Sequence, residues 1–331
     1  MDLHYQITKK HQLIKNKSQA YNNKFMKFKK RIITLFLLVV NTYLGMCQQD
    51  PLFTQYSYNT MTANPAYTGS RGHLNAIALY RNQWSNIEGA PKTISFGIDS
   101  PVGIVDGIGL SIIQDELGPS SETFIDFNYS HHLILNRNGD RLALGLKGGA
   151  RFFSLDWSKG RHRDPEAVFN ENVNSKLLPT AGAGVFFYTD RAFIGVSTPN
   201  IFLGKHYDAI EEEEATEKMH LFLLTGYVFD LNPFLKFKPT LYAKYVSGAP
   251  ISVDGSVNFL LNEVLTLGVN YRWDESVSAL IGFQFSPKVS MGYAYDYSIN
   301  ELNSYNSGTH EIFIRFQAIS KLTKLKSPRF F

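Results

Sequence analysis

Residues 265–273 read Leu-Thr-Leu-Gly-Val-Asn-Tyr-Arg-Trp, and this stretch decides the fold. In an extended chain the two Leu, Val, Tyr and Trp share one face, while Thr, Gly, Asn and Arg share the other. Such period-two alternation predicts a β-strand with one apolar and one wet face. The run 251–261 repeats the pattern, with Val253, Val257 and Phe259 opposite Asp254.

Similar runs continue in both directions along the chain, with hardly a helix between them. Many end in Tyr, Phe or Trp. In a soluble sandwich the apolar face would pack on a second sheet. The pattern favours a closed barrel that faces lipid outward and water inward. We therefore predict an all-β fold, a transmembrane antiparallel up-and-down β-barrel of about 14 strands in a single domain. The expected strands are 74–83, 92–99, 107–115, 122–132, 141–152, 179–189, 191–198, 220–230, 235–246, 251–261, 264–273, 277–286, 288–297 and 309–319.

The connections between these strands are sorted by length. Bacterial barrels have short periplasmic turns and longer outer loops. If the N-terminus is periplasmic, each connection from an even to an odd strand should be short, and each long one should fall on the other side. The short connections are 190–191, 231–234, 262–263 and 287, and the long ones are 153–178, 199–219 and 298–308.

Composition agrees with a barrel. Aromatic residues make up 14% of the 331 residues and charged residues only 19%. The mean hydropathy of −0.16 excludes a helical membrane protein, whereas a barrel strand is half polar. No Pro- or Ser-rich linker divides the chain.

The N-terminus carries a predicted secretory signal. The apolar run 32–40 follows the basic stretch 26–31 and is too short for a spanning helix, which needs about 20 residues. We expect residues 1–47 to be a leader and signal peptide, with translation starting at Met26 and cleavage after Cys47. Alternatively, Cys47 is lipidated. Cys47 is the only cysteine, so neither interpretation allows a disulfide framework.

The positive charge of the chain belongs to this leader. The whole chain has 33 Lys and Arg against 29 Asp and Glu. Residues 1–47 hold nine of the basic residues and one of the acidic residues. The remainder has 24 basic and 28 acidic residues, a net charge of about −4. Nucleic acid is therefore not an expected partner. The remaining domains are a periplasmic N-terminal segment at 48–73, the barrel at 74–319 and a C-terminal tail at 320–331.

Motifs at the two ends of the mature chain resemble one family. The motifs are Asn64-Pro65-Ala66-Tyr67-Thr68-Gly69, Tyr80-Arg81-Asn82-Gln83-Trp84, Gly308-Thr309-His310-Glu311-Ile312 and Ser327-Pro328-Arg329-Phe330-Phe331. Together they are similar to the PorP/SprF family of type IX secretion system membrane proteins.

The resemblance implies an outer-membrane barrel of fourteen strands from a Bacteroidota-type bacterium. It further implies a non-enzymatic accessory of type IX secretion that assists export or surface attachment of a client, such as an adhesin in gliding motility. Its expected partners are outer-membrane lipid and either periplasmic secretion components or the client. The alternative function is an outer-membrane diffusion channel or small-solute transporter.

Ten residues are candidates for partner contact or for a plug. Asn64, Pro65, Tyr67 and Gly69 form a segment that either plugs the periplasmic mouth or merely closes the barrel end as a packed turn. Arg81 is expected in the lumen, Trp84 in the interfacial aromatic girdle, and His310 in a hydrogen bond of the wall. The last three candidates, Arg329, Phe330 and Phe331, are either an assembly signal or part of a docking tail.

No catalytic, cofactor or metal site is predicted. His131 and His132 are adjacent on a strand and should point to opposite faces. The acids 211–214 lack the spacing of a calcium loop, which favours a solvated loop. The run 161–163 is a charged loop that suits lipopolysaccharide phosphates or a client. Gly145, Gly148 and Gly149 are interpreted as small residues in a curved wall.

Overall fold

The computed structural model describes residues 58–159, 172–201 and 219–318. Several predicted features lie outside the described residues: the expected signal peptide with Met26 and Cys47, the runs 161–163 and 211–214, and the tail with Arg329, Phe330 and Phe331. Every strand lies in one compact unit, which spans residues 48–247 and 251–331. No helix in the described ranges has the length and apolarity needed to cross a membrane.

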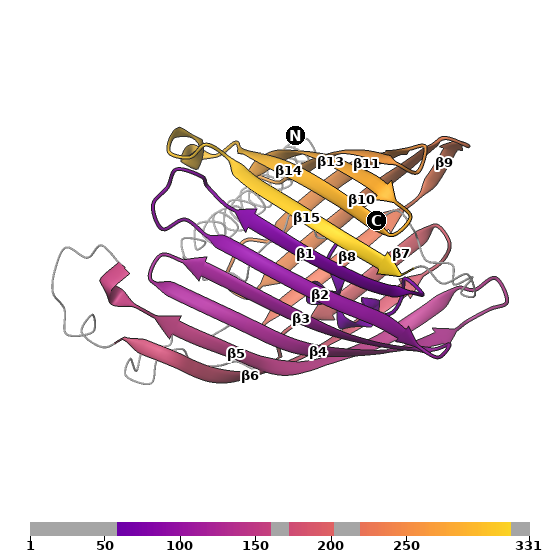
Figure 1. Ribbon diagram of the computed structural model, residues 1–331, viewed down its shortest axis with the longest axis horizontal. Helices are drawn as coiled ribbons and strands as arrows, with labels where there is room; N and C mark the ends of the chain where they lie inside the picture. Colours follow the sequence, from indigo (N-terminus) through magenta and orange to yellow (C-terminus); the bar gives the residue numbers. More distant parts are fainter. Residues whose placement is uncertain (1–57, 160–171, 202–218, 319–331) are drawn as a thin grey trace, which may run out of the picture. The chain divides into compact units, whose positions relative to one another are not determined.

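The alternating runs form antiparallel strands, as Figure 1 shows. Their bounds follow the predicted ranges to within a few residues, apart from the start of β6, which lies at Val173 rather than at 179. The strands are β1 (Leu74–Asn82), β2 (Lys92–Val102), β3 (Asp106–Leu117), β4 (Ser120–Ile134), β5 (Arg141–Leu155), β6 (Val173–Tyr188), β7 (Ala192–Thr198), β8 (His220–Tyr227), β9 (Phe229–Asn232), β10 (Leu235–Val246), β11 (Ser252–Leu261), β12 (Leu265–Arg272), β13 (Ser276–Ser286), β14 (Val289–Ser298) and β15 (Thr309–Ala318).

The sheet closes on itself. Apart from β8 and β9, which both pair with β10, each strand pairs with its neighbours in sequence. The first strand β1 pairs with the last strand β15 from Leu74 opposite Ala318 to Asn82 opposite His310. These two strands run side by side in Figure 1. The order of strands is therefore that of an up-and-down barrel, in which no edge is left unpaired.

Strands β8 and β9 form one side of a single ladder against β10. Thr240 lies opposite Gly226, and Phe237 lies opposite Phe229, so both pieces share one register. The interruption at Val228 is next to Pro239 on β10, which has no N–H to give to a ladder. Counted as one strand, β8 and β9 bring the total to fourteen, and the predicted fold class is confirmed.

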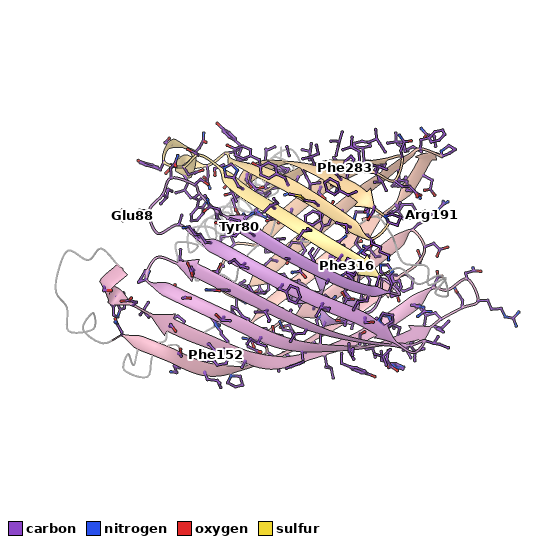
Figure 2. The ribbon with its side chains drawn as sticks, viewed as in Figure 1. Tyr80, Glu88, Phe152, Arg191, Phe283 and Phe316 are labelled. Atoms are coloured by element: carbon purple, nitrogen blue, oxygen red, sulfur yellow. The ribbon has the colours of Figure 1, made fainter. Side chains whose placement is uncertain are left out.

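The two faces of the wall have opposite polarity, as predicted. On β12 and β13 the side chains of Val269, Tyr271 and Ile281 are 47–52% exposed, whereas Asn270 and Arg272 are 5% and 1% exposed. Tyr80, Phe283 and Phe316, labelled in Figure 2, belong to the same apolar outer face. On these strands apolar residues therefore face outward, and polar residues face the interior.

Connection lengths also follow the predicted sorting. At one end of the barrel the turns are short, and the two residues of the β11–β12 turn, Asn262 and Glu263, both have positive φ (50° and 58°). Two left-handed residues in succession give the tight turn that matches strand twist. The other end carries the long connections 83–91, 156–172, 199–219 and 299–308, and also short ones such as 118–119 and 273–275.

Candidate functional site

The segment that precedes β1 lies inside the barrel and not below its mouth. It contains a short helix α2 (Thr60–Ala63) and a 3₁₀ turn η1 (Pro65–Tyr67). Pro65 takes the first position of η1, where its missing N–H costs nothing, and the Asn64 side chain accepts from the N–H of Ala66 at 3.0 Å. Local sequence thus explains the turn, and its partners in the wall explain its position.

Two hydrogen bonds fix the start of this turn to strands β6 and β7 of the wall. The Asn64 side-chain amide donates to the backbone oxygen of Val185 on β6 at 3.1 Å. The hydroxyl of Ser197 on β7 donates to the backbone oxygen of Ala63 at 2.9 Å. Asn64 is 3% exposed, so these bonds form away from solvent and their loss would leave buried polar atoms without partners.

The end of the segment is held from the opposite side. The N–H of Gly69 donates to a carboxylate oxygen of Asp99 on β2 at 2.9 Å, and Asn75 donates to the other oxygen at 2.7 Å. Gly69 has φ = +71°, and a Cβ there would lie 2.8 Å from the Cα of Gly107. Only glycine satisfies both the left-handed backbone and this close approach.

Glycines in the wall leave room for the segment. A Cβ at Gly107 on β3 would overlap the carbonyl of Thr68, and one at Gly145 on β5 would overlap the backbone of Ala66. A Cβ at Gly184 on β6 would overlap the Asn64 side chain. Gly145, interpreted from the sequence as a small residue of the curved wall, lies on β5 and leaves the space that Ala66 occupies. The neighbouring Gly148 has open space around it.

Apolar side chains complete this seat. Ala66 is fully buried against a cluster that includes Ala143, Phe186 and Phe222, and the Tyr67 ring meets the Phe186 ring edge-on at 5.3 Å between centroids. Burial of this kind contributes roughly 25 cal/mol per Å² of apolar surface. The segment is therefore anchored by packing as well as by hydrogen bonds.

Ion pairs line other parts of the interior. Arg81 on β1 lies 3.0 Å from a carboxylate oxygen of Asp296 on β14 and 3.0 Å from one of Glu311 on β15, and all three side chains are at most 4% exposed. Lys147 pairs with Asp126 at 2.8 Å in the same manner. Charges this deep need partners, because an unpaired buried charge is strongly destabilising.

The remaining candidates lie apart from the seat of the segment. Trp84 lies in the β1–β2 connection, half-buried and with φ = 47°, and its backbone N–H donates to the Thr309 hydroxyl at 3.1 Å. Nδ1 of His310 lies 2.7 Å from the hydroxyl of Tyr293. The structure therefore gathers Asn64, Pro65, Tyr67 and Gly69 in one place, with Arg81, Trp84 and His310 elsewhere on the wall and its loops.

The seat also uses residues that sequence reasoning missed. Ser130 and His132 on β4 both reach the carbonyl of Thr68, at 2.6 and 2.9 Å. His132 is 2% exposed while the side chain of its neighbour His131 is 43% exposed, so the two do point to opposite faces. In the part of the chain that the structure describes, no three His, Cys, Asp or Glu side chains gather as metal ligands would.

A closed antiparallel barrel with an apolar outer face and a polar interior defines the protein as an outer-membrane β-barrel. Residues 46–316 match the family model of the type IX secretion system membrane protein PorP/SprF. The chain belongs to this family, as its end motifs indicated.

Comparison with solved structures finds other barrels. The outer membrane protein Omp33 of Acinetobacter baumannii is 7% identical with a TM-score of 0.45, over 74% of this chain and 98% of that one. The toluene transporter TbuX of Ralstonia pickettii is 11% identical with a TM-score of 0.48, over 78% and 92% of the two chains. A search of curated proteins gives no match.

Proposed function

We propose that this protein is a non-enzymatic accessory of type IX secretion that assists the export or surface attachment of a client protein. Membership of the PorP/SprF family supports the link to secretion. The observation that carries the proposal is that the segment 58–73 lies inside the barrel. Ala66 and Thr68 of this segment are 0% exposed. An interior filled by the chain's own N-terminal segment suits a scaffold better than an open pore.

In this proposal the segment acts as a plug that is built into the wall. Asn64, Pro65, Tyr67 and Gly69 anchor it, since each contributes a hydrogen bond, a turn position or a packed ring at the seat. The long connections at the other end of the barrel would face the client outside the cell. The two termini, including Arg329, Phe330 and Phe331, would face the periplasmic machinery, and residues 1–47 would be removed on export.

Affinity purification tests the accessory role. A tag inserted in the connection 199–219 allows recovery of the barrel from native outer membranes, followed by mass spectrometry. Co-purification of type IX components or of one large surface protein would support the proposal and identify the partner. The same tag placed in an unrelated barrel of the same membrane is the control for carry-over.

The alternative is a diffusion channel or small-solute transporter, and one observation favours it. A cavity of about 680 Å³ lies between the segment and the wall. Conductance of the purified barrel in planar bilayers separates the two functions. Recovery of the barrel without partners, together with steady conductance, would replace the accessory role by the channel.

A further inference from the structure

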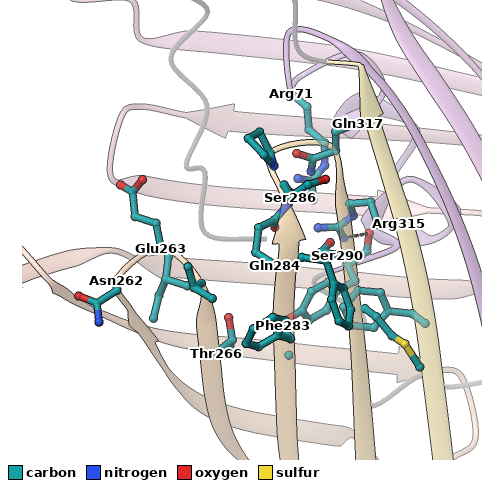
Figure 3. A pocket seen from close by; sticks show the side chains of 18 of the residues that line it. Arg71, Asn262, Glu263, Thr266, Phe283, Gln284, Ser286, Ser290, Arg315 and Gln317 are labelled. Atoms are coloured by element: carbon teal, nitrogen blue, oxygen red, sulfur yellow. Dashed lines mark hydrogen bonds between the residues drawn. The ribbon is translucent and has the colours of Figure 1, made fainter.

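The cavity lies at the barrel end where the β11–β12 and β13–β14 turns are found. The N-terminal segment forms one side of it, and strands β12 to β15 form the other (Figure 3). Its lining combines apolar side chains with three Lys or Arg side chains and the carboxylate of Glu263. The lining side chains on which the argument depends are Tyr58, Arg71 and Arg315.

Arg315 on β15 is held in place by the segment. Its guanidinium lies over the Tyr58 ring at 4.8 Å and near the Phe313 ring at 5.6 Å, and Nη2 donates to the backbone oxygen of Tyr58 at 2.7 Å. Arg315 is 2% exposed, and its Nε has no hydrogen-bond partner. The aromatic contacts therefore fix the position of the charge without using all of its donors.

Arg71 presents a second buried guanidinium to the same cavity. It is 4% exposed and lies 5.7 Å from the centre of the Tyr67 ring. Its Nε and Nη2 have no hydrogen-bond partner. The carboxylate of the buried Asp99 beside the segment accepts from Gly69 and Asn75.

Three other buried cations of the interior each have a carboxylate partner. Arg81, Lys147 and Arg272 each lie within 3.0 Å of a buried carboxylate. Among the described residues, neither Arg71 nor Arg315 has a carboxylate within ion-pair distance. Two buried guanidiniums with unused donors that line one cavity form an arrangement that recognises oxygen anions.

We propose that this cavity is a binding site for a small oxyanion, a phosphate or a carboxylate, which bridges Arg71 of the N-terminal segment and Arg315 of the wall. The bound anion satisfies the orphaned N–H groups and neutralises two like charges. It thereby ties the segment to β15. The site goes beyond the proposed secretion role, and it would persist in a barrel with a different partner.

Isothermal titration of the purified, detergent-solubilised barrel tests the site. Inorganic phosphate and acetate are titrated separately at constant ionic strength, so that the two sources of oxyanion are distinguished. We expect saturable one-site binding of at least one of them. Arg71→Gln and Arg315→Gln should each weaken it about tenfold or more, since each removes charge-assisted hydrogen bonds. Arg315→Lys should give an intermediate affinity.

Arg191→Gln is the matched control, because this arginine lies in an exposed turn and pairs with Asp230. It should bind like the wild type. Heat-modifiable migration of each variant checks that the barrel has folded. If Arg315→Gln does not fold, Arg71→Gln carries the test, because Arg71 lies outside the strands. Absence of saturable binding of both anions, or unchanged affinity in the folded Arg71→Gln variant, overturns the proposal.

Discussion

Nε2 of His132 lies 2.9 Å from the backbone oxygen of Thr68 and ties strand β4 to the segment inside the barrel. The carbonyl only accepts, so Nε2 carries the hydrogen, and Nδ1 accepts from the Tyr188 hydroxyl at 2.9 Å. A chain of hydrogen bonds thus runs from β6 through β4 to the segment. Most predictions below test what this seat and the wall around it contribute.

His132→Ala should loosen the segment. The substitution leaves the Tyr188 hydroxyl without this partner and weakens the bond to Thr68, at a cost of about 1–3 kcal/mol. Trypsin should then cleave faster after Arg71, which is 4% exposed in the native protein. His131→Ala is the control, because His131 faces outward and bonds to Asp106. Equal cleavage rates in the two variants would show that His132 does not hold the segment.

Gly145→Val should displace the segment, because even a Cβ at this position overlaps Ala66. Overpacking typically costs about 1–3 kcal/mol, and here it can be relieved by movement of the segment. We expect a higher conductance in planar bilayers than for the wild type. Gly148→Val, three residues further along β5, meets no atom and should behave as the wild type. Two folded variants of equal conductance would contradict the prediction.

Arg81→Met should destabilise the barrel strongly. It leaves Asp296 and Glu311 buried without their shared cation, and breaking a buried pair in this way costs about 3–5 kcal/mol. Urea unfolding monitored by heat-modifiable migration measures the loss. Arg191→Met breaks an exposed pair and should cost less than about 1 kcal/mol. The triple variant Arg81→Met, Asp296→Asn, Glu311→Gln should recover much of the stability; a deficit as large as that of the single variant would argue against the ion-pair explanation.

Val269→Arg tests the orientation of the wall. Val269 is 52% exposed on the apolar outer face, where a charge costs about 2–4 kcal/mol near the bilayer midplane. The variant should assemble poorly, with little heat-modifiable barrel in the outer membrane. Ile104→Arg, in the β2–β3 turn, should cost about 0–1 kcal/mol. Normal assembly of Val269→Arg would mean that this face does not contact lipid.

The barrel was predictable because its signal is local. In β12 the alternation of apolar and polar side chains is visible within the strand itself. The predicted strand 264–273 differs from the observed strand Leu265–Arg272 by one residue at each end. The start of β6 was missed because Asn174, Ser175, Lys176 and Pro179 interrupt the apolar alternation, although Pro179 does pair with Ala150 on β5.

The seat of the segment was not predictable to the same degree. The motif from Asn64 to Gly69 drew attention through its turn residues, but its partners lie far away in sequence. His132 is 64 residues from Thr68, and Gly145 shows no sign in the sequence that it faces Ala66 rather than lipid. Such contacts depend on how the closed wall places several strands around one turn, which local alternation does not encode.

The position of Arg81 has a consequence for how a client would leave this barrel. Arg81 lies directly opposite Glu311 in the pairing of β1 with β15, where the beginning and end of the wall meet. Parting these strands to make a lateral gate would separate three buried charges and expose unpaired backbone to lipid. The buried ion pairs thus hold the two ends of the wall together, and sideways release of a polypeptide between β1 and β15 would have to break them.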